Sequence, residues 1–258
     1  MVFKVADIDE SQAPLLDHLI ELRNRLLWCV AAMAIAFGVC FYFAKPIFGF
    51  LVQPLLAAGQ GKLIFTDIFE AFFVEIKVAF FAATMVAFPV LATQLWRFVA
   101  PGLYSKEKRA FLPFLLMTPV LFTAGAAMAY YLAMPVALEF LLGFSGDVGG
   151  VSQEALPGVG NYLSFATKFL FGFGVAFLLP VLLMLLERVG ILTLAQLKAG
   201  RRYAVVGIAV VSAVLTPPDI MSQILLLVPM YLLYEMAILA IMITGRRRAK
   251  QEEAAAAE

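Results

Sequence analysis

Histidine and cysteine are nearly absent from this sequence of 258 residues. His18 is the only histidine, so we expect neither a histidine metal site nor a histidine-based catalytic triad within one chain. The two cysteines, Cys29 and Cys40, share one apolar stretch and lie about 16 Å apart along a helix, too far to pair with each other. No phosphate loop, nucleophile elbow or metal-ligand spacing occurs. The sequence therefore predicts no metal, no cofactor and no enzymatic activity.

Charge is also scarce. Only 14% of the residues are charged, 63% are hydrophobic, and the mean hydropathy is +0.95. A soluble domain of this size would have to leave much of that apolar surface in water, so the composition excludes one and indicates an integral membrane protein with several helical spans. The net charge of +1 gives no reason to expect a nucleic-acid partner.

Six apolar stretches are predicted to be the spans: 26–43, 71–96, 111–135, 162–186, 203–215 and 221–243. Crossing the hydrocarbon takes about 20 helical residues. The fifth stretch is shorter than that, and it ends at Thr216-Pro-Pro-Asp219, where two prolines must stop a helix. The alternative is that stretches five and six form a re-entrant hairpin, but a short crossing is preferred because it puts Arg201 and Arg246 on the same side of the membrane.

The basic residues set the orientation. In a six-span topology all but four of the 19 Lys and Arg residues lie on the side of the two termini; the exceptions are Lys45, Lys62, Lys77 and Lys168. By the positive-inside rule that side is the cytoplasm. The first 17 residues carry acids where a cleavable secretion signal carries basic residues, so the first span is expected to remain as a membrane helix.

The expected fold is an all-α integral membrane protein, a cupped bundle of six transmembrane helices with cytoplasmic termini and with spans five and six short. It forms one membrane domain over residues 1–258. Residues 1–25 are a cytoplasmic segment, and 245–258 form a disordered cytoplasmic tail. The outer segments 44–70 and 136–161 are apolar enough to pack as short capping helices, and the glycine-rich 146–160 is expected to be a loop. Prolines are expected to kink the helices at Pro89, Pro119, Pro135, Pro180 and Pro229.

Two cytoplasmic segments carry candidate binding residues. Residues 18–25, HLIELRNR, place Glu21 and Arg25 four apart, where they can pair on a helix surface. In the loop 100–109, APGLYSKEKR, one acid, Glu107, stands among basic residues. Both segments can be explained as orientation charges, and an exposed ion pair contributes only about 0–1 kcal/mol. An acid in a basic loop also suggests a basic ligand.

Intramembrane polar groups are the other candidates, because charge near mid-bilayer is costly and tends to face protein or water. Glu235 lies in the middle of span six. Asp219 lies at its outer start near Gln223, and the alternative role for it is that of a helix N-cap. An alternative function is a small-solute secondary transporter using Asp219 and Glu235 as coupling groups. It is less favoured because no internal repeat is visible, and a membrane-embedded enzyme lacks paired catalytic residues.

Three separated motifs in this order resemble the TatC family, the receptor subunit of the twin-arginine protein translocase, over nearly the whole chain. They are HLIELRNR at 18–25, FVAPGLYSKEKR at 98–109, and LTPPD at 215–219 followed by Ser222, Gln223 and PMYLLYE at 229–235. The resemblance implies a receptor that recognises the Arg-Arg pair of signal peptides on folded cargo in the bacterial inner membrane. The signal-binding residues that it implies are Glu21, Arg23, Phe98, Glu107 and Arg109.

The resemblance also implies single-span partners of the TatA and TatB type, a homo-oligomer within the complex, and a proton motive force as the energy source. The partners are expected on the face of spans five and six, near Met221 and Gln223, with Glu235 further along the same helix. One position departs from the family. Where many members carry Glu or Gln before the proline of span four, this chain has Leu178.

Overall fold

The computed structural model describes residues 9–103, 112–149, 151–153, 155–216 and 219–256. Its helices are α1 (Asp9–Tyr42), α2 (Ala44–Ala57), α3 (Glu70–Leu103), α4 (Leu112–Met128), a π-helical turn (Ala129–Ala133), α5 (Met134–Leu142), α6 (Val159–Ala176), α7 (Leu179–Arg188), α8 (Leu194–Ala199), α9 (Arg201–Leu215) and α10 (Ile220–Ala256). A two-stranded antiparallel sheet joins β1 (Gly146–Val148) to β2 (Val151–Gln153).

Five segments of the described chain are long and apolar enough to cross a bilayer: Leu19–Tyr42, Glu70–Phe98, Phe114–Leu142, Val159–Arg188 and Ile220–Gly245. The remaining predicted span, the fifth, is α9, which has 15 residues and is short, as expected. The six-span helical membrane bundle is thereby confirmed. The expectation that span six is short as well is wrong, because its apolar segment has 26 residues.

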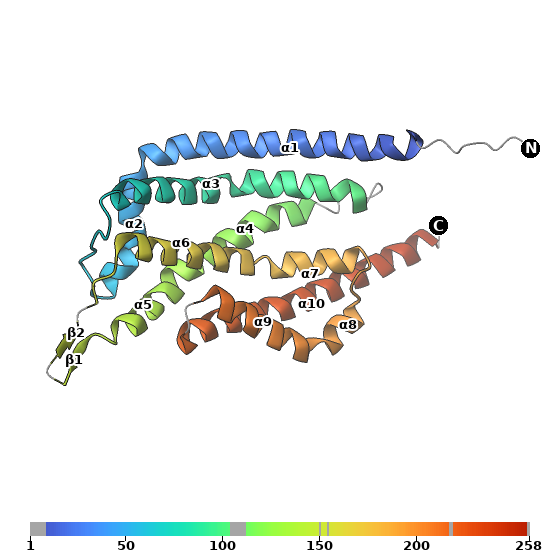
Figure 1. Cartoon of the computed structure of the whole chain (residues 1–258). Coiled ribbons are helices and arrows are strands. Elements are labelled where there is room, and N and C mark those ends of the chain that lie inside the picture. The colour runs from blue at the N-terminus through green and yellow to red at the C-terminus, as the bar shows by residue number, and fades with distance from the viewer. Residues whose placement is uncertain (1–8, 104–111, 150, 154, 217–218, 257–258) are drawn as a thin grey trace, which may run out of the picture.

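The helices share a common long axis, with α4 and α5 crossing obliquely, and α1 begins at the same end of the bundle at which α10 finishes (Figure 1). We call this the basic end. The opposite end, which carries α2 and the β1–β2 hairpin, is the cap end (Figure 1).

The helices α1 and α3 pack along their length, with small buried residues between them: Cys40, Ala79 and Ala83. Small side chains let two helix backbones approach closely, which is how membrane helices gain contact area. The rest of α1 exposes large apolar side chains such as Trp28 and Ile35. That pattern suits a helix with hydrocarbon rather than water on its outer side.

The core centres on α6, where Phe169 and Phe173 are fully buried. The helix stops after Ala176, and α7 restarts at Leu179 with Pro180 in its first turn. A proline ring has no N–H to donate, and it clashes with the carbonyl four residues earlier, so a break is expected at this point. Leu178 lies half-buried in the break. Of the other predicted kink sites, Pro135 lies in the first turn of α5, whereas Pro119 and Pro229 lie inside continuous helices.

The cap end is held by side chains from distant parts of the chain. The Tyr130 hydroxyl donates to the Phe50 carbonyl at 2.7 Å, and the Tyr162 hydroxyl donates to the Leu51 carbonyl at 2.6 Å. The apolar outer segments thus supply the short capping helices α2 and α5, as predicted. The segment expected to be only a glycine-rich loop contains the β1–β2 hairpin, since its Val and Ser residues favour extended pairing between glycines that permit the turn.

The chain beyond Gly245 also differs from expectation. Helix α10 continues to Ala256, through the segment for which the composition predicts disorder. Ala, Glu, Lys and Arg are strong helix formers, and a helix that is already formed extends without a new nucleation cost.

Candidate functional site

The acidic and basic residues of segment 18–25 lie on α1 near the basic end. Arg25 binds the Glu21 carboxylate through Nε at 3.2 Å and also through Nη2, so the predicted pair forms. Arg23 is exposed and donates to the Asn24 side chain at 3.3 Å. The Glu21 carboxylate is therefore already shared with one guanidinium before any ligand arrives.

The antiparallel packing of α1 on α3 sets which residues lie at the same height. Thr84 Oγ1 is 3.9 Å from Met33 Sδ, so these two residues lie at the same height. Because the helices are antiparallel, twelve residues before Met33 and twelve residues after Thr84 lead to the same level, which places Glu21 level with Trp96. Phe98 follows within the same turn and is partly exposed. The structure thus brings two of the predicted binding residues, Glu21 and Phe98, to one level of the basic end.

A cross-helix hydrogen bond joins the two helices, α3 and α4, that flank the segment containing Glu107 in the sequence. Trp96 Nε1 donates to Thr118 Oγ1 at 2.8 Å, and that buried hydroxyl donates to the Phe114 carbonyl at 2.7 Å. These bonds tie the last turns of α3 to the first turns of α4. Glu107 and Arg109 themselves lie outside the described residues. The sequence motifs did not include Trp96 or Thr118. The one feature that could have suggested this contact is a tryptophan in one span and a threonine in the next.

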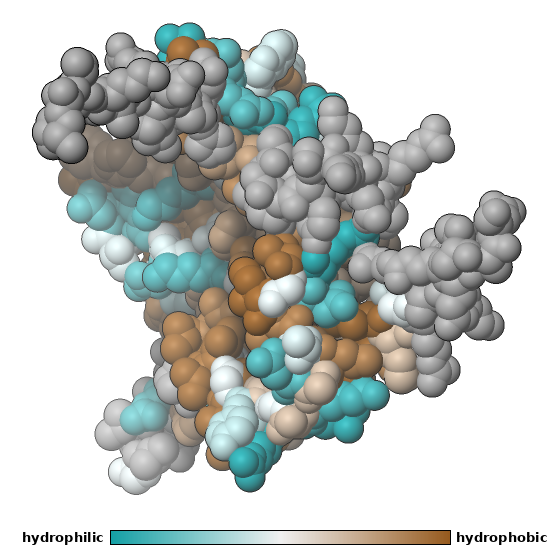
Figure 2. Space-filling view, turned by 90° about the vertical axis from the view of Figure 1, so that its right-hand side faces the viewer, coloured by the Kyte–Doolittle hydropathy of each residue, from teal (hydrophilic) through white to brown (hydrophobic). Residues whose placement is uncertain are grey.

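Figure 2 looks onto the basic end of the bundle. Hydrophilic side chains lie on either side of an apolar strip that runs through the middle of this face (Figure 2). The face is therefore amphipathic, with polar groups and apolar surface side by side.

The second set of predicted residues lies at the start of α10. Asp219 is 5% exposed, and its Oδ1 accepts the backbone N–H of Ser222 at 2.6 Å. It is therefore the N-cap of α10, which is one of the two roles that the sequence suggested for Asp219. Gln223 reaches across to α9, where its Nε2 donates to the Ala209 carbonyl at 3.3 Å.

Beside this cap, α9 and α10 present an exposed apolar face. Met221, Ile220 and Val214 are all more than half exposed. Large apolar side chains on a membrane protein's surface face either lipid or another helix.

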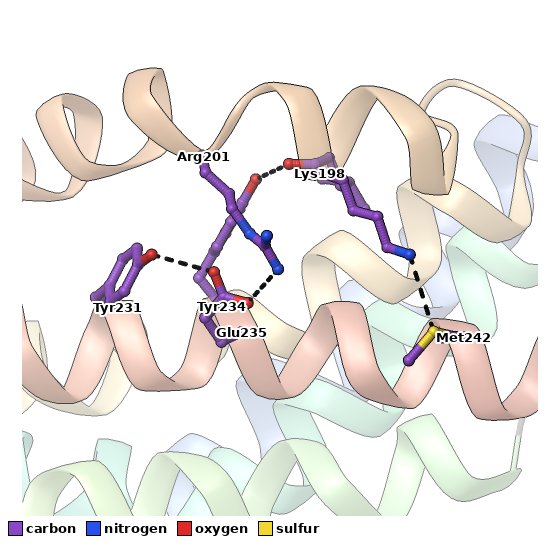
Figure 3. Close-up of polar contacts among 7 residues, drawn as sticks. Lys198, Arg201, Tyr231, Tyr234, Glu235 and Met242 are labelled. Carbon is purple, nitrogen blue, oxygen red and sulfur yellow. Dashed lines mark hydrogen bonds and ion pairs between the residues drawn. The ribbon is translucent and has the colours of Figure 1, made fainter.

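Glu235 is the acceptor in a polar cluster that joins α8 and α9 to α10 (Figure 3). Its Oε2 accepts a hydrogen bond from Arg201 Nη2 at 2.8 Å, and its Oε1 accepts one from the Tyr231 hydroxyl at 3.1 Å. One residue earlier, the Tyr234 hydroxyl donates to the Leu197 carbonyl at 2.7 Å. The intramembrane acid is thus neutralised within the chain and pins the short helix α9 to the longer α10.

We expect Arg201→Glu to lower the thermal unfolding temperature of the detergent-solubilised protein, because it sets two carboxylates against each other. The loss is about 1 kcal/mol or more of unfolding free energy, since the pair is only partly exposed. The double variant Arg201→Glu/Glu235→Arg restores most of it. The matched control is Arg202→Glu, which removes an exposed guanidinium that stacks on Tyr203 alone. Equal losses for Arg201→Glu and Arg202→Glu contradict the pairing argument.

No group of three His, Cys, Asp or Glu side chains able to hold a metal occurs in the part of the chain that the structure describes. A different carboxylate, that of Glu70, organises the cap end and lies in none of the sequence motifs. Glu70 accepts the N–H of Gly160 at 2.6 Å and the hydroxyl of Thr66 at 2.9 Å. Gly160 is 90 positions away in the chain, so spacing gave no signal for this contact.

Comparison with known proteins agrees with this architecture. Residues 17–229 match the family model for the Sec-independent protein translocase protein TatC. The TatC protein of Magnetococcus marinus is 46% identical over 96% of this chain and 91% of its own length. That of Escherichia coli K12 is 39% identical over 89% of this chain and 88% of its own.

Solved structures agree as well. A crystal structure of the twin arginine translocase receptor TatC superposes with a TM-score of 0.73, at 39% identity, over 88% of this chain and 99% of that one. A second crystal structure of that receptor, in the detergent DDM, gives the same TM-score at 40% identity over 86% of this chain and 98% of that one. This chain therefore belongs to the TatC family and is a membrane component of the Sec-independent protein translocase rather than an enzyme.

Proposed function

We propose that this chain is the receptor of a twin-arginine translocase and binds the Arg-Arg motif of signal peptides at its basic end. The observation that supports the proposal is that Glu21 and Phe98 lie on one level of that end, where the Trp96–Thr118 hydrogen bond joins the helices that flank residues 104–111 in the sequence. A guanidinium binds a carboxylate through two parallel, charge-assisted hydrogen bonds. Glu107, aided by Glu21, takes the two arginines of the peptide, and Arg23, Phe98 and Arg109 complete the site.

The basic end faces the cytoplasm in this proposal. Both α1 and α10 have their free ends there, and the Lys and Arg residues concentrate on that side of a six-span chain. Folded cargo is made in the cytoplasm, so its signal peptide meets the acids of this end first. The cap end then faces outward from the bacterial inner membrane.

Single-span partners of the TatA and TatB type dock on the exposed apolar face of α9 and α10. Met221 lies on that face, and the partly buried Gln223 lies at its edge. The apolar face suits a membrane helix that packs on α9, which is too short to span a full hydrocarbon core alone. The proton motive force drives transport by a homo-oligomeric complex of these subunits.

The transporter alternative is disfavoured by how its two coupling groups are used. Asp219 caps α10, and Glu235 pairs with Arg201. Sixteen residues of α10 separate them, which is about 24 Å along the helix, so they do not converge on one solute site.

Site-specific photocrosslinking tests the proposal. A photoreactive phenylalanine analogue in place of Tyr104, three residues before Glu107 in the sequence, is expected to capture a signal peptide with an Arg-Arg pair and not its Lys-Lys variant, because an ammonium cannot form the two-point bond. The same analogue in place of Phe144, an exposed aromatic residue at the cap end, is the control and captures neither peptide. Equal capture of both peptides at Tyr104 would sink the proposed recognition.

A further inference from the structure

An open cavity of about 530 Å³ with both polar and apolar walls lies between α3 and α6 near the cap end. Its lining includes Asp67 in the turn before α3, Phe73 and Lys77 on α3, and Asn161 and Ser164 on α6. It is far from the basic end, and the proposed signal-peptide site does not use it. The lining combines a cation, an acid, small polar groups and an aromatic wall.

Glu70 builds the outer frame of this cavity. Its carboxylate accepts the backbone N–H groups of Thr66, Asp67 and Gly160 together with the Thr66 hydroxyl. A Cβ at Gly160 would stand 2.8 Å from Glu70 Oε1, so glycine is needed for this approach. With its oxygens satisfied by these donors, the Glu70 carboxylate is committed to the frame rather than to a nearby lysine.

Two lysines lie below this frame at one depth. The Glu70–Gly160 contact aligns α3 with α6, and both helices run from the cap end towards the basic end (Figure 1). Lys77 lies seven residues after Glu70, and Lys168 lies eight after Gly160, about 10 Å and about 12 Å along the two helix axes. Lys168 is also one turn beyond Ser164, on the same side of α6 as the cavity lining.

Neither ammonium group forms an ion pair within the described part of the chain. Both side chains are exposed, and the recorded ion pairs there join other residues. Each of these cations is costly at membrane depth. Their long side chains extend towards the nearest polar zone, which is the headgroup layer at the cap end.

We propose that this cavity holds the headgroup of a phospholipid from the leaflet at the cap end, with Lys77 and Lys168 on its phosphate. From the cap end inward the groups follow in the order Asp67, Phe73 and Lys77. Asp67 at the rim faces the outer part of the headgroup, the two lysine side chains extend from the deeper end to the phosphate, and Phe73 forms a side wall between them. A lipid phosphate is the anion that a bilayer supplies at this depth. The occupant enters sideways from the bilayer, since Phe73 and Lys77 are exposed on the helix surface.

Native mass spectrometry of the detergent-solubilised full chain tests the site. Phosphatidylglycerol and phosphatidylethanolamine are added separately, and the dissociation constant of the most tightly retained lipid is measured. Lys77→Ala/Lys168→Ala is expected to raise that constant at least tenfold, because two charge-assisted bonds to phosphate are lost. The matched control Lys45→Ala/Lys62→Ala removes two exposed cap-end lysines outside the cavity and leaves the constant unchanged. Lys77→Arg/Lys168→Arg retains the lipid.

The remaining outcomes contradict the assignment in different ways. Equal lipid affinity in the wild type and Lys77→Ala/Lys168→Ala contradicts the proposed lipid site. Equal losses of lipid affinity in both double-alanine variants show that the lipid is held by general charge attraction and not by this cavity. Displacement of the lipid by millimolar inorganic phosphate assigns the site to a free anion instead. If carbodiimide treatment of native membranes joins Lys77 or Lys168 to a carboxylate of another membrane protein, and lipid affinity is unaltered, the cations serve a partner helix. Thermal unfolding of each variant confirms that its fold is intact.

Discussion

Replacing Glu107 by alanine is expected to abolish export of twin-arginine precursors while leaving the protein inserted in the membrane at normal abundance. The carboxylate is the proposed partner of a guanidinium, and each hydrogen bond to a charged group contributes about 1.5–3 kcal/mol. Loss of a two-point bond then weakens signal-peptide binding roughly a hundredfold or more. Export is measured as the fraction of a twin-arginine reporter recovered outside the cytoplasm, and insertion as the amount of the variant in washed membranes.

Matched variants separate recognition from general charge. Glu187→Ala removes a carboxylate at the same end, on α7, outside the proposed site, and is expected to leave export intact. Glu21→Ala is expected to reduce export less than Glu107→Ala, because Glu21 already shares its charge with Arg25. Glu107→Asp keeps the charge on a shorter side chain and retains part of the activity. Normal export by Glu107→Ala would remove this residue from the site.

Gly125→Ala is expected to destabilise the bundle more than Gly174→Ala or Gly207→Ala. A Cβ at Gly125 would stand 2.6 Å from the Phe173 carbonyl oxygen and 2.8 Å from Phe177 Cβ. The backbone carbonyl cannot move without displacing α6, so α4 and α6 must separate. Overpacking of this kind costs about 1–3 kcal/mol of unfolding free energy. The measurement is the thermal unfolding temperature in detergent.

Two other glycines provide the comparison for Gly125. At Gly174 the added methyl would meet the Phe122 ring at 2.7 Å, and a side chain can yield where a backbone cannot, so Gly174→Ala costs less. At Gly207 nothing lies within 4 Å, so Gly207→Ala is neutral or stabilising by up to about 1 kcal/mol through helix propensity. Equal unfolding temperatures for Gly125→Ala and Gly207→Ala would contradict the close packing of α4 on α6.

Leu178 is the position at which the sequence departs from the pattern that the family resemblance implies. The structure places it half-buried in the break between α6 and α7, ahead of Pro180. A leucine there offers no hydrogen bond to a partner helix. In the described part of this chain polar contacts between membrane helices are made at other positions, among them Trp96 to Thr118, Gln223 to α9 and Glu235 to Arg201.

The sequence by itself determined the membrane class, the number of spans and the candidate recognition residues. Apolar runs set span length because hydrocarbon thickness is fixed, and Thr216-Pro-Pro-Asp219 had to end α9 and offer a cap for α10. The family motifs named Glu21 and Glu107 as acids for a basic ligand. The hairpin β1–β2 and the helical continuation of α10 were missed, since short strands and charged tails carry weak local signals.

Only the tertiary structure decided which side chains meet. Glu70 with Gly160, Glu235 with Arg201, and Trp96 with Thr118 are contacts between separate helices. A run of apolar residues gives a span its length, but neither its neighbours nor its rotation about its own axis. Those follow from close packing at small residues such as Gly125 and Ala79, which act only when all the helices are in place. Residue spacing in the sequence therefore could not predict that Glu235 pairs within the chain. Nor could it predict that Lys77 and Lys168 form no ion pair in the described part of the chain.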